Sequence, residues 1–340
     1  MCTRVDLKAA SKVDLHRHLE GAVRLRTLLD LYREHGRPLP ETSEAELAPR
    51  AQVLEPMRSL EDVLSRFTVA QGAFFDAAAC ERIAFEAVED LAADNVRLAE
   101  LRFSPEFLCA PHGLDWDESL AAIARGTERA GARLGVAVGL IAIASRNYGL
   151  ESAERTAEFA WRHRDRLVGF DLAGNEQAYP PSLYVDVVAG LDGSGLHLTT
   201  HYGESGGAEF PREAVEALDS ERLGHGVSVV EDPSVVALVR ERAVTLEMCP
   251  TSNRRTGAVS DIAEHPARRL LDQDVSVTIN TDNPGLFAID LTNELEVCVD
   301  LLGFSEEDLK RVTSNAIDAS FVDDESKADV RRRHFEWVDA

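Results

Sequence analysis

KVDLHRHLEG, residues 12–21, lies near the start of the 340-residue chain and opens with the alternating apolar side chains of a strand, predicted at residues 13–16. Successive side chains of a strand point to opposite faces, so His16 and His18 share one face. Two imidazoles at the end of an apolar strand can bind one metal ion, and nitrogen ligands suit zinc and similar divalent metals. The pair alone does not establish a metal site, because the remaining ligands must come from elsewhere in the chain.

The rest of the chain alternates short β-branched runs with longer segments of helical periodicity. Strands are predicted at residues 13–16, 96–103, 136–144, 167–172, 196–200, 222–224, 244–248 and 275–279. Helices are predicted at residues 24–35, 74–94, 115–134, 151–163, 181–191, 211–218, 233–242, 266–272, 293–302 and 305–319, and an irregular insertion at 41–72 contains a helical piece at 60–67. This alternation predicts an α/β fold, a (β/α)8 TIM barrel with a helical insertion after strand one, formed by residues 1–340 as a single domain. No Gly-x-Gly-x-x-Gly follows the first strand, which argues against a dinucleotide-binding fold.

The composition limits the partners and the compartment. A formal net charge of -24 argues against nucleic acids and anionic membranes as partners, and no apolar run reaches the length of a transmembrane helix. The N-terminus lacks the basic and apolar regions of a signal peptide, and the 5 cysteines show no metal-ligand spacing. We therefore expect a cytoplasmic protein with a small-molecule partner. The sequence is compatible with a monomer and with a homo-oligomer.

Polar side chains capable of chemistry gather where the predicted strands end. His16 and His18 end strand one, His201 follows strand five, His225 follows strand six and Asp282 follows strand eight. Active sites of such barrels lie at the C-terminal ends of the strands, so these side chains can converge on one ion. A catalytic zinc site keeps a position for water and lowers the pKa of that water toward neutrality, which generates hydroxide near pH 7.

The other acid and base candidates follow from their positions. Glu204 lies three residues beyond His201 and is placed to donate and accept the proton that such a reaction needs. His197 shares a strand face with His201 but lies about 13 Å deeper at roughly 3.3 Å per residue, so it is predicted to lie in the core. The histidines in helical or loop stretches are predicted to lie on the surface: His35, His112, His163, His265 and His334.

Six short motifs, in order along the chain, resemble those of the adenosine deaminase family of metal-dependent hydrolases. They are HRHLEG at 16–21, LRFSP at 101–105, DLAGNE at 171–176, HYGE at 201–204, LGHG at 223–226 and TDNP at 281–284. The corresponding family patterns include His-x-His-Leu-Asp-Gly, His-Ala-Gly-Glu and Thr-Asp-Asp-Pro. The resemblance spans strands one to eight and implies both the barrel and the deamination of a purine.

The resemblance implies a role for each matching position. One Zn²⁺ per chain would be bound, with water as a fifth ligand, by His16, His18, His201 and Asp282. Glu204 would protonate the purine ring nitrogen next to the reacting carbon, and His225 and Asp282 would hold the attacking water and help to deprotonate it. Gly174 would offer its backbone to the purine. The implied substrate-binding residues are His18, Glu20, Ser104, Gly174 and Asn283.

Two positions depart from the family pattern. Glu20 replaces an Asp that resembles a ligand of a ribose hydroxyl, and its extra methylene leaves less space for a sugar. Asn283 replaces the second Asp of the strand-eight motif, which contacts purine N7. An apolar lid over the substrate is implied for Leu60, Val63, Leu64 and Phe67. The spacing of these four residues is also that of an ordinary amphipathic helix.

The leading prediction is hydrolytic deamination of adenosine and deoxyadenosine to inosine and deoxyinosine, in which hydroxide adds to purine C6 and ammonia leaves. The alternative is a deaminase of free adenine or of a modified adenosine such as aminodeoxyfutalosine. A binuclear amidohydrolase commonly uses a modified lysine at the end of strand four, but no lysine lies between Lys12 and Lys310. A binding protein without activity would be expected to have lost Glu204 or a metal ligand, and none of them is missing.

Overall fold

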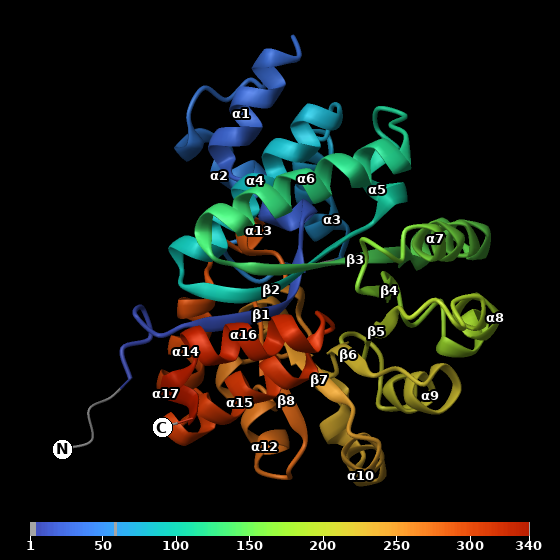
Figure 1. The fold of residues 1–340 in the computed structure, drawn as a ribbon, viewed down its shortest axis with the longest axis vertical. Coiled ribbons are helices and arrows are strands. Elements are labelled where there is room, and N and C mark those ends of the chain that lie inside the picture. Colours follow the sequence, from blue (N-terminus) through green and yellow to red (C-terminus); the bar gives the residue numbers. More distant parts are fainter. Residues whose placement is uncertain (1–4, 58–59, 340) are drawn as a thin grey trace.

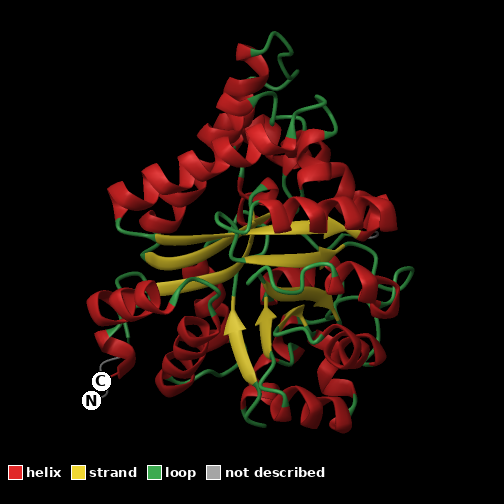
Figure 2. Cartoon of the chain, turned by 45° about the vertical axis from the view of Figure 1, so that its right-hand side comes forward, coloured by secondary structure: helices red, strands yellow, loops and turns green. Residues whose placement is uncertain are grey.

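The computed structural model of the chain describes residues 5–57 and 60–339, and its centre is an eight-stranded sheet in the order β1 to β8 (Figure 1, Figure 2). The strands, all parallel to their neighbours, are β1 (Lys12–His18), β2 (Val96–Phe103), β3 (Ala137–Ser145), β4 (Gly169–Ala173), β5 (His197–Tyr202), β6 (Arg222–His225), β7 (Thr245–Met248) and β8 (Ser276–Ile279). The barrel closes between β8 and β1. There the backbones of Arg17 and Asp282 form a parallel β-bridge, and the backbone N–H of His18 donates to the Asp282 carbonyl at 2.8 Å. The predicted (β/α)8 fold is confirmed.

The strands are buried on both faces, which is why they are short apolar runs in the sequence. Leu101 and Phe103 of β2 belong to the large apolar cluster that the strands form with the surrounding helices. Glu100 and Arg102 of the same strand are equally buried but form ion pairs with β4, β6 and β7 across the barrel. The interior of the barrel is therefore charged, and it supports the residues at the strand ends.

Helices surround the sheet, as Figure 2 shows. They are α1 (Leu25–Glu34), α2 (Glu44–Ala51), α3 (Leu60–Gln71), α4 (Ala77–Ala93), α5 (Pro105–Cys109), α6 (Trp116–Leu134), α7 (Leu150–Arg162), α8 (Val185–Ala189), α9 (Glu209–Leu218), α10 (Pro233–Glu241), α11 (Pro250–Thr256), α12 (Ala267–Leu271), α13 (Pro284–Phe287), α14 (Leu291–Asp300), α15 (Glu306–Ala319), α16 (Asp324–His334) and α17 (Glu336–Asp339). The predicted insertion after the first strand is confirmed, because α1 to α4 all precede β2. In the described part of the chain no helix has both the length and the apolar character needed to cross a membrane.

The C-terminal helices α16 and α17 were not predicted. Most residues of α16 are charged and only Val330 is buried, so no apolar period of 3.6 residues marks the helix in the sequence. Phe335, which follows it, is fully buried in a cluster with Val13, Leu15 and Leu98 of β1 and β2. Figure 1 shows α15 to α17 beside β1. The end of the chain thus packs against the strands that begin the barrel.

Two predictions about histidines are wrong. His197 is the first residue of β5, and its side chain is 46% exposed, where it pairs with Glu221 at 2.8 Å and stacks on Phe321. A period of two gives the face of a strand but does not show whether the end of the strand is covered. His265 precedes α12 and is buried with 3% of its surface exposed, because its ring packs into the site and bonds to Asn253.

Candidate metal and catalytic site

The ends of β1, β5, β6 and β8 bring together the five residues singled out at strand ends. Nε2 of His18 lies 3.1 Å from Nε2 of His201 and 3.2 Å from Oδ1 of Asp282, and Nε2 of His16 lies 3.5 Å from the same oxygen. The ring of His225 lies 4.8 Å from that of His16, measured between centroids. All five side chains thus face one point at the mouth of the barrel.

The backbone at this point is strained. His225 at the end of β6 and Asp282 just after β8 have φ values of 65° and 60°, in the left-handed region that residues with a Cβ rarely adopt. Hydrogen bonds to β1 hold Asp282 in this conformation, because its N–H donates to the His16 carbonyl and its own carbonyl accepts from His18, each at 2.8 Å. Such conformations cluster at functional sites, where the surrounding structure enforces them.

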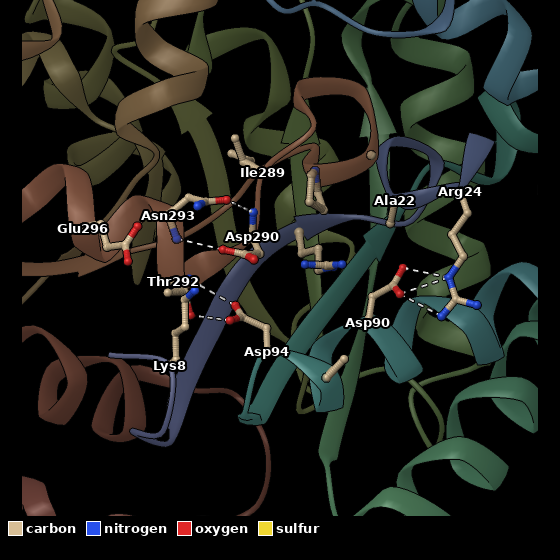
Figure 3. Close-up of a pocket in the computed structure, with 14 residues that line it drawn as sticks. Lys8, Ala22, Arg24, Asp90, Asp94, Ile289, Asp290, Thr292, Asn293 and Glu296 are labelled. Atoms are coloured by element: carbon tan, nitrogen blue, oxygen red, sulfur yellow. Dashed lines mark hydrogen bonds and ion pairs between the residues drawn. The ribbon is translucent and has the colours of Figure 1, made fainter. Parts of the chain in front are cut away.

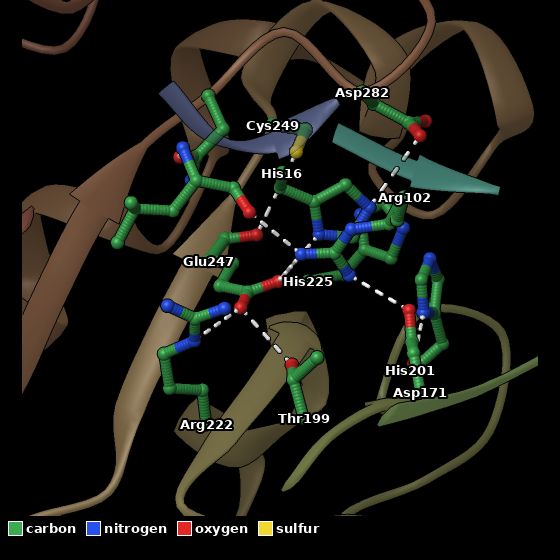
Figure 4. A network of polar contacts seen from close by, with 12 residues as sticks. His16, Arg102, Asp171, Thr199, His201, Arg222, His225, Glu247, Cys249 and Asp282 are labelled. Carbon is green, nitrogen blue, oxygen red and sulfur yellow. Dashed lines mark hydrogen bonds and ion pairs between the residues drawn. The ribbon is translucent and has the colours of Figure 1, made fainter. Parts of the chain in front are cut away.

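Two buried carboxylates orient the imidazoles. Nδ1 of His16 lies 2.7 Å from Oε2 of Glu247, and Nδ1 of His201 lies 3.0 Å from Oδ1 of Asp171 (Figure 4). A carboxylate accepts hydrogen bonds only, so each Nδ1 carries the proton and each Nε2 presents a lone pair to the site. Neither Glu247 nor Asp171 was singled out from the sequence. The signal was available for Glu247, an acid between two apolar residues of a buried strand.

An arginine joins these two carboxylates at the centre of the barrel. The Arg102 guanidinium is fully buried and donates to Asp171 at 2.8 Å, to Glu247 at 2.7 Å and to the Leu15 carbonyl at 2.7 Å. Glu247 also pairs with Arg222 at 2.7 Å. Removing one member of such a network costs about 3–5 kcal/mol, because it leaves an unpaired buried charge. Asp171, Glu247 and Arg102 therefore hold the rings of His16 and His201 in fixed orientations (Figure 4).

The pKa values of His18, His201 and Asp282 match those of a metal-ligand set. Burial lowers the pKa of His201 to about 4 and holds the pKa of His18 well below its usual range. Burial alone would raise the pKa of Asp282, but His16, whose Nε2 lies 3.5 Å away, and the other nearby imidazoles hold that pKa well below its usual range. Neutral imidazoles and an ionised carboxylate are the forms that bind a divalent cation.

The residues present fit a metal ion. Nε2 of His16 is buried and has no hydrogen-bond partner within residues 5–57 and 60–339. Nε2 of His201 lies 3.1 Å from Nε2 of His18, and Nε2 of His16 lies 3.5 Å from Oδ1 of Asp282, so four possible ligand atoms crowd together where a cation could bind them. Gly224 of β6 leaves room for these rings, because a Cβ there would lie 3.0 Å from Cε1 of His16 and 3.1 Å from Cγ of His201. Three nitrogens and one oxygen suit zinc.

Glu204 lies in the turn after β5 and faces the same centre. Its Oε1 accepts from the Thr256 hydroxyl at 3.0 Å, and its Oε2 lies 3.7 Å from Nε2 of His225. Glu176 holds this turn in place with one buried carboxylate. It accepts from the backbone N–H of Gly203 at 2.6 Å, of Glu204 at 2.9 Å and of Gly206 at 2.8 Å, and from both donors of Ser205.

Glu176 was not assigned a role from the sequence, although it ends the DLAGNE motif at residues 171–176. Its place in this motif indicates a role for Glu176 in the site. Asn253, which contacts His225, and His265, which contacts Asn253, lay in no motif, and His265 was placed on the surface. A contact between loops that follow different strands leaves no periodic pattern in the sequence.

A cavity of about 630 Å³ opens above the site. Its lining includes His18, His201, Glu204, His225 and Asp282, and also Gly174 and Asn283. Val63 and Phe67 of α3 form part of its wall, as expected for a lid, whereas the side chains of Leu60 and Leu64 lie outside the described residues. Pockets for small molecules commonly have 300–1,000 Å³, so this one is large enough for a nucleoside.

Three predicted substrate-binding residues differ in how they meet this cavity. Asn283 is 6% exposed, and its Oδ1 has no partner in the part of the chain that the structure describes. It precedes α13 without capping it, so its amide is available to a ligand. Glu20 and Ser104 do not line the cavity. Oε1 of Glu20 instead accepts from the Ser104 N–H at 2.7 Å, and burial raises the pKa of Glu20 to about 7.

A second cavity of about 490 Å³ lies outside the barrel wall, between α4 and α14 (Figure 3). Some of its charged residues already have partners. Arg24 bonds to Asp90 at 2.7 Å, and Asp94 accepts from the backbone N–H of Leu291 and Thr292. No residue of the strand-end cluster lines it.

The fold and the site together define a class of protein. A (β/α)8 barrel that gathers three imidazoles and a carboxylate at its C-terminal mouth, with a carboxyl group beside them, is a metal-dependent hydrolase.

Comparisons with known proteins identify the family. Residues 11–337 match the adenosine deaminase family. An adenosine deaminase from Erwinia tasmaniensis is 36% identical over 320 residues, which cover 94% of this chain and 96% of the relative. The chain belongs to the adenosine deaminase family. It is an enzyme, a hydrolase of the deaminase type that depends on a metal and acts on a small molecule.

Solved structures agree with this assignment. An adenine deaminase from Arthrobacter aurescens has a TM-score of 0.90 at 27% sequence identity, covering 98% of this chain and 100% of that one. An amidohydrolase with bound zinc from Burkholderia ambifaria has a TM-score of 0.87 at 28% identity, covering 98% of this chain and 92% of that one.

Proposed function

We propose that the protein converts adenosine and deoxyadenosine to inosine and deoxyinosine by hydrolysis, with release of ammonia. The observation that carries this proposal is the position of Glu204, His225 and Asp282 on the wall of one cavity with His18 and His201. An acid, a hydrogen-bonding ring and a carboxylate then face one substrate at once. The adenosine deaminases among the relatives support the choice of substrate.

We propose one Zn²⁺ per chain as the cofactor, held by His16, His18, His201 and Asp282. When bound, zinc would lower the pKa of a water molecule so that it reacts as hydroxide near neutral pH. Zinc rather than another divalent metal is supported by the donor set and by the zinc in the amidohydrolase from Burkholderia ambifaria.

The residues of the chain supply the proton transfers. Glu204 gives a proton to the purine ring nitrogen beside C6, which makes that carbon electrophilic. His225 and Asp282 hold the attacking water and help to deprotonate it. As the C–O bond forms, one proton of the water passes to His225 or Asp282. As the C–N bond breaks, that proton leaves with the amino group as ammonia, and the proton of the new hydroxyl group returns to Glu204.

Other residues orient the purine in the cavity. Gly174 has a φ of 105°, which lets its backbone approach the ring without a side chain in the way. The Asn283 amide can donate to purine N7, which is an acceptor. Val63 and Phe67 cover the substrate from α3. Their apolar side chains limit the access of water.

A second candidate is a deaminase of free adenine or of a modified adenosine such as aminodeoxyfutalosine. One observation favours adenine. Glu20, at the position expected to bind a ribose hydroxyl, does not line the cavity, and its Oε1 accepts from the Ser104 N–H. The adenine deaminase from Arthrobacter aurescens is also similar over its whole length.

An ultraviolet assay on adenosine, deoxyadenosine, adenine and aminodeoxyfutalosine tests the proposal. We expect turnover of both nucleosides by the zinc-loaded protein, and at least about a 10²-fold loss in Glu204→Gln, which keeps its size but cannot transfer a proton. Metal content should remain near one zinc per chain in that variant and fall in His201→Ala. Turnover of adenine with none of either nucleoside would replace the proposal with the second candidate.

The proposal also covers the organisation and the compartment of the protein. We treat residues 1–340 as one catalytic domain of a cytoplasmic enzyme. Cys80, Cys109, Cys249 and Cys298 are all buried and free, which suits a reducing compartment.

A further inference from the structure

The Nδ1 atoms of His16, His201 and His225 have partners of two kinds. His16 and His201 donate Nδ1–H to carboxylates, so their Nε2 atoms carry lone pairs. His225 has a different partner, because its Nδ1 lies 3.0 Å from the side-chain amide nitrogen of Asn253. An amide nitrogen can only donate.

The direction of the hydrogen bond between Asn253 and His225 follows from the hydrogen bonds of His265, which begin at a backbone N–H. The N–H of Ala267 donates to Nδ1 of His265 at 3.3 Å, and a backbone N–H has no alternative role. Burial lowers the pKa of His265 to about 3, so the ring is neutral and carries its single proton on Nε2. That proton is donated to Oδ1 of Asn253 at 3.0 Å. The opposite amide orientation would place two donors face to face.

The chain of bonds therefore ends at His225. With Oδ1 of Asn253 turned to His265, its amide nitrogen must face Nδ1 of His225 and donate to it. A neutral His225 then carries its proton on Nε2, the atom that lies 3.7 Å from Oε2 of Glu204 in the wall of the cavity.

We propose that Asn253 and His265 are positioning residues that hold His225 in the tautomer with its proton on Nε2. His225 then acts as a hydrogen-bond donor to the oxygen that attacks the substrate, and neither binds the metal nor removes a proton. This inference rests on the proposed function and narrows it, since Asp282 alone then accepts the proton of the water. Two groups of side chains lie close enough together to hold an ion: His16, His18 and Asp282 form one, and His16, His201 and His225 form the other. A protonated Nε2 on His225 excludes the second group.

The tautomer can be measured directly. In histidine-selectively ¹⁵N-labelled, zinc-loaded protein, long-range ¹H–¹⁵N correlations distinguish a ring protonated on Nε2 from one protonated on Nδ1. We expect the Nε2 pattern for His225 and His265 and the Nδ1 pattern for His16 and His201. A His225 ring protonated on Nδ1 would overturn the inference, whatever the activity of the enzyme.

A variant tests the cause. In Asn253→Asp a carboxylate lies between the two rings and accepts from both, so the proton of His225 should move to Nδ1. We expect turnover to fall about 10²-fold with zinc retained, the scale on which losing one donor to a developing charge is felt. His265→Phe, which keeps a ring but removes the donor to Asn253, should give a mixture of His225 tautomers.

The matched control is Asn315→Asp. Asn315 is also a partly buried asparagine whose amide donates, here to the Val277 carbonyl at 3.0 Å, and it lies on α15 away from the cavity. This variant should leave the His225 pattern and the turnover unchanged. Full turnover in Asn253→Asp after a measured tautomer reversal would refute the role of His225 as a donor. A wild-type protein without deaminase activity would refute the proposed function instead, and the ring spectrum would still decide the tautomer.

Discussion

Glu294 should make the stability of the protein fall as the pH rises. Its side chain on α14 is fully buried, its Oε2 accepts from the Thr251 N–H at 2.9 Å, and its Oε1 has no partner among the described residues. Burial raises the pKa of this carboxyl from 4.5 to about 7. The native state therefore keeps a proton between these two pH values that the unfolded state has lost.

The sign and size of the effect follow from this difference. Where the native state binds more protons than the unfolded state, the free energy of unfolding decreases with rising pH. A difference of about 2.5 in pKa, at about 1.4 kcal/mol for each pH unit, gives a loss of about 3 kcal/mol between pH 4.5 and pH 7. Glu294→Gln cannot ionise and keeps an oxygen for the Thr251 N–H, so it should not show this loss.

Urea unfolding of wild type and Glu294→Gln at several pH values from 4.5 to 8 would measure the effect. We expect the variant to gain on the wild type by about 3 kcal/mol across the range, with equal m-values. Glu296→Gln, on the same helix but not fully buried, controls for the loss of one negative charge. A difference between Glu294→Gln and wild type that stays constant within about 1 kcal/mol would show that Glu294 is already ionised in the native state.

Three further substitutions test the site. Glu176→Gln replaces one acceptor of the turn around Glu204 with a donor, so kcat should fall about 10-fold or more while the metal content stays unchanged. This is the scale of about 1.5–3 kcal/mol for a charge-assisted hydrogen bond. Steady-state kinetics with metal analysis would check the prediction, and loss of metal would contradict it. Gly224→Ala places a methyl group against His16 and His201, so metal affinity should fall about 10-fold, measured by competition with a chelator. Asn283→Asp should keep zinc but lose kcat/KM on adenosine more steeply as pH rises, because an Asp must keep a shared proton to bond N7; the same change on 7-deazaadenosine would show that Asn283 does not contact N7.

The barrel and the strand-end cluster could be predicted because both depend on local periodicity. A period of two placed His16 and His18 on one face, and the parallel barrel then brought His201, His225 and Asp282 to the same end. Nothing beyond strand order was needed for that step.

What could not be predicted depends on contacts between distant segments. His265 lies before α12 and meets His225 only through Asn253, so no spacing in the sequence indicates that it is buried. Glu20 matches a family position, but no pattern in the sequence indicates that its Oε1 accepts from the Ser104 N–H. In both cases a contact between distant segments decides the outcome.

The closure of the barrel between β8 and β1 has a consequence for how the protein is made. Leu15 and Asn280, which bond across this closure, are 265 positions apart, and the neighbouring His16 and Asp282 contribute to one cluster. A growing chain on the ribosome has only part of this cluster until its eighth strand has emerged. With the proposed ligand set, tight metal retention would be acquired late in synthesis, and a truncated chain that stops before residue 282 would lack it. An ion held by His16, His18 and Asp282 would also close a very long loop, which removes chain entropy from the unfolded state in the way a long-range disulfide does.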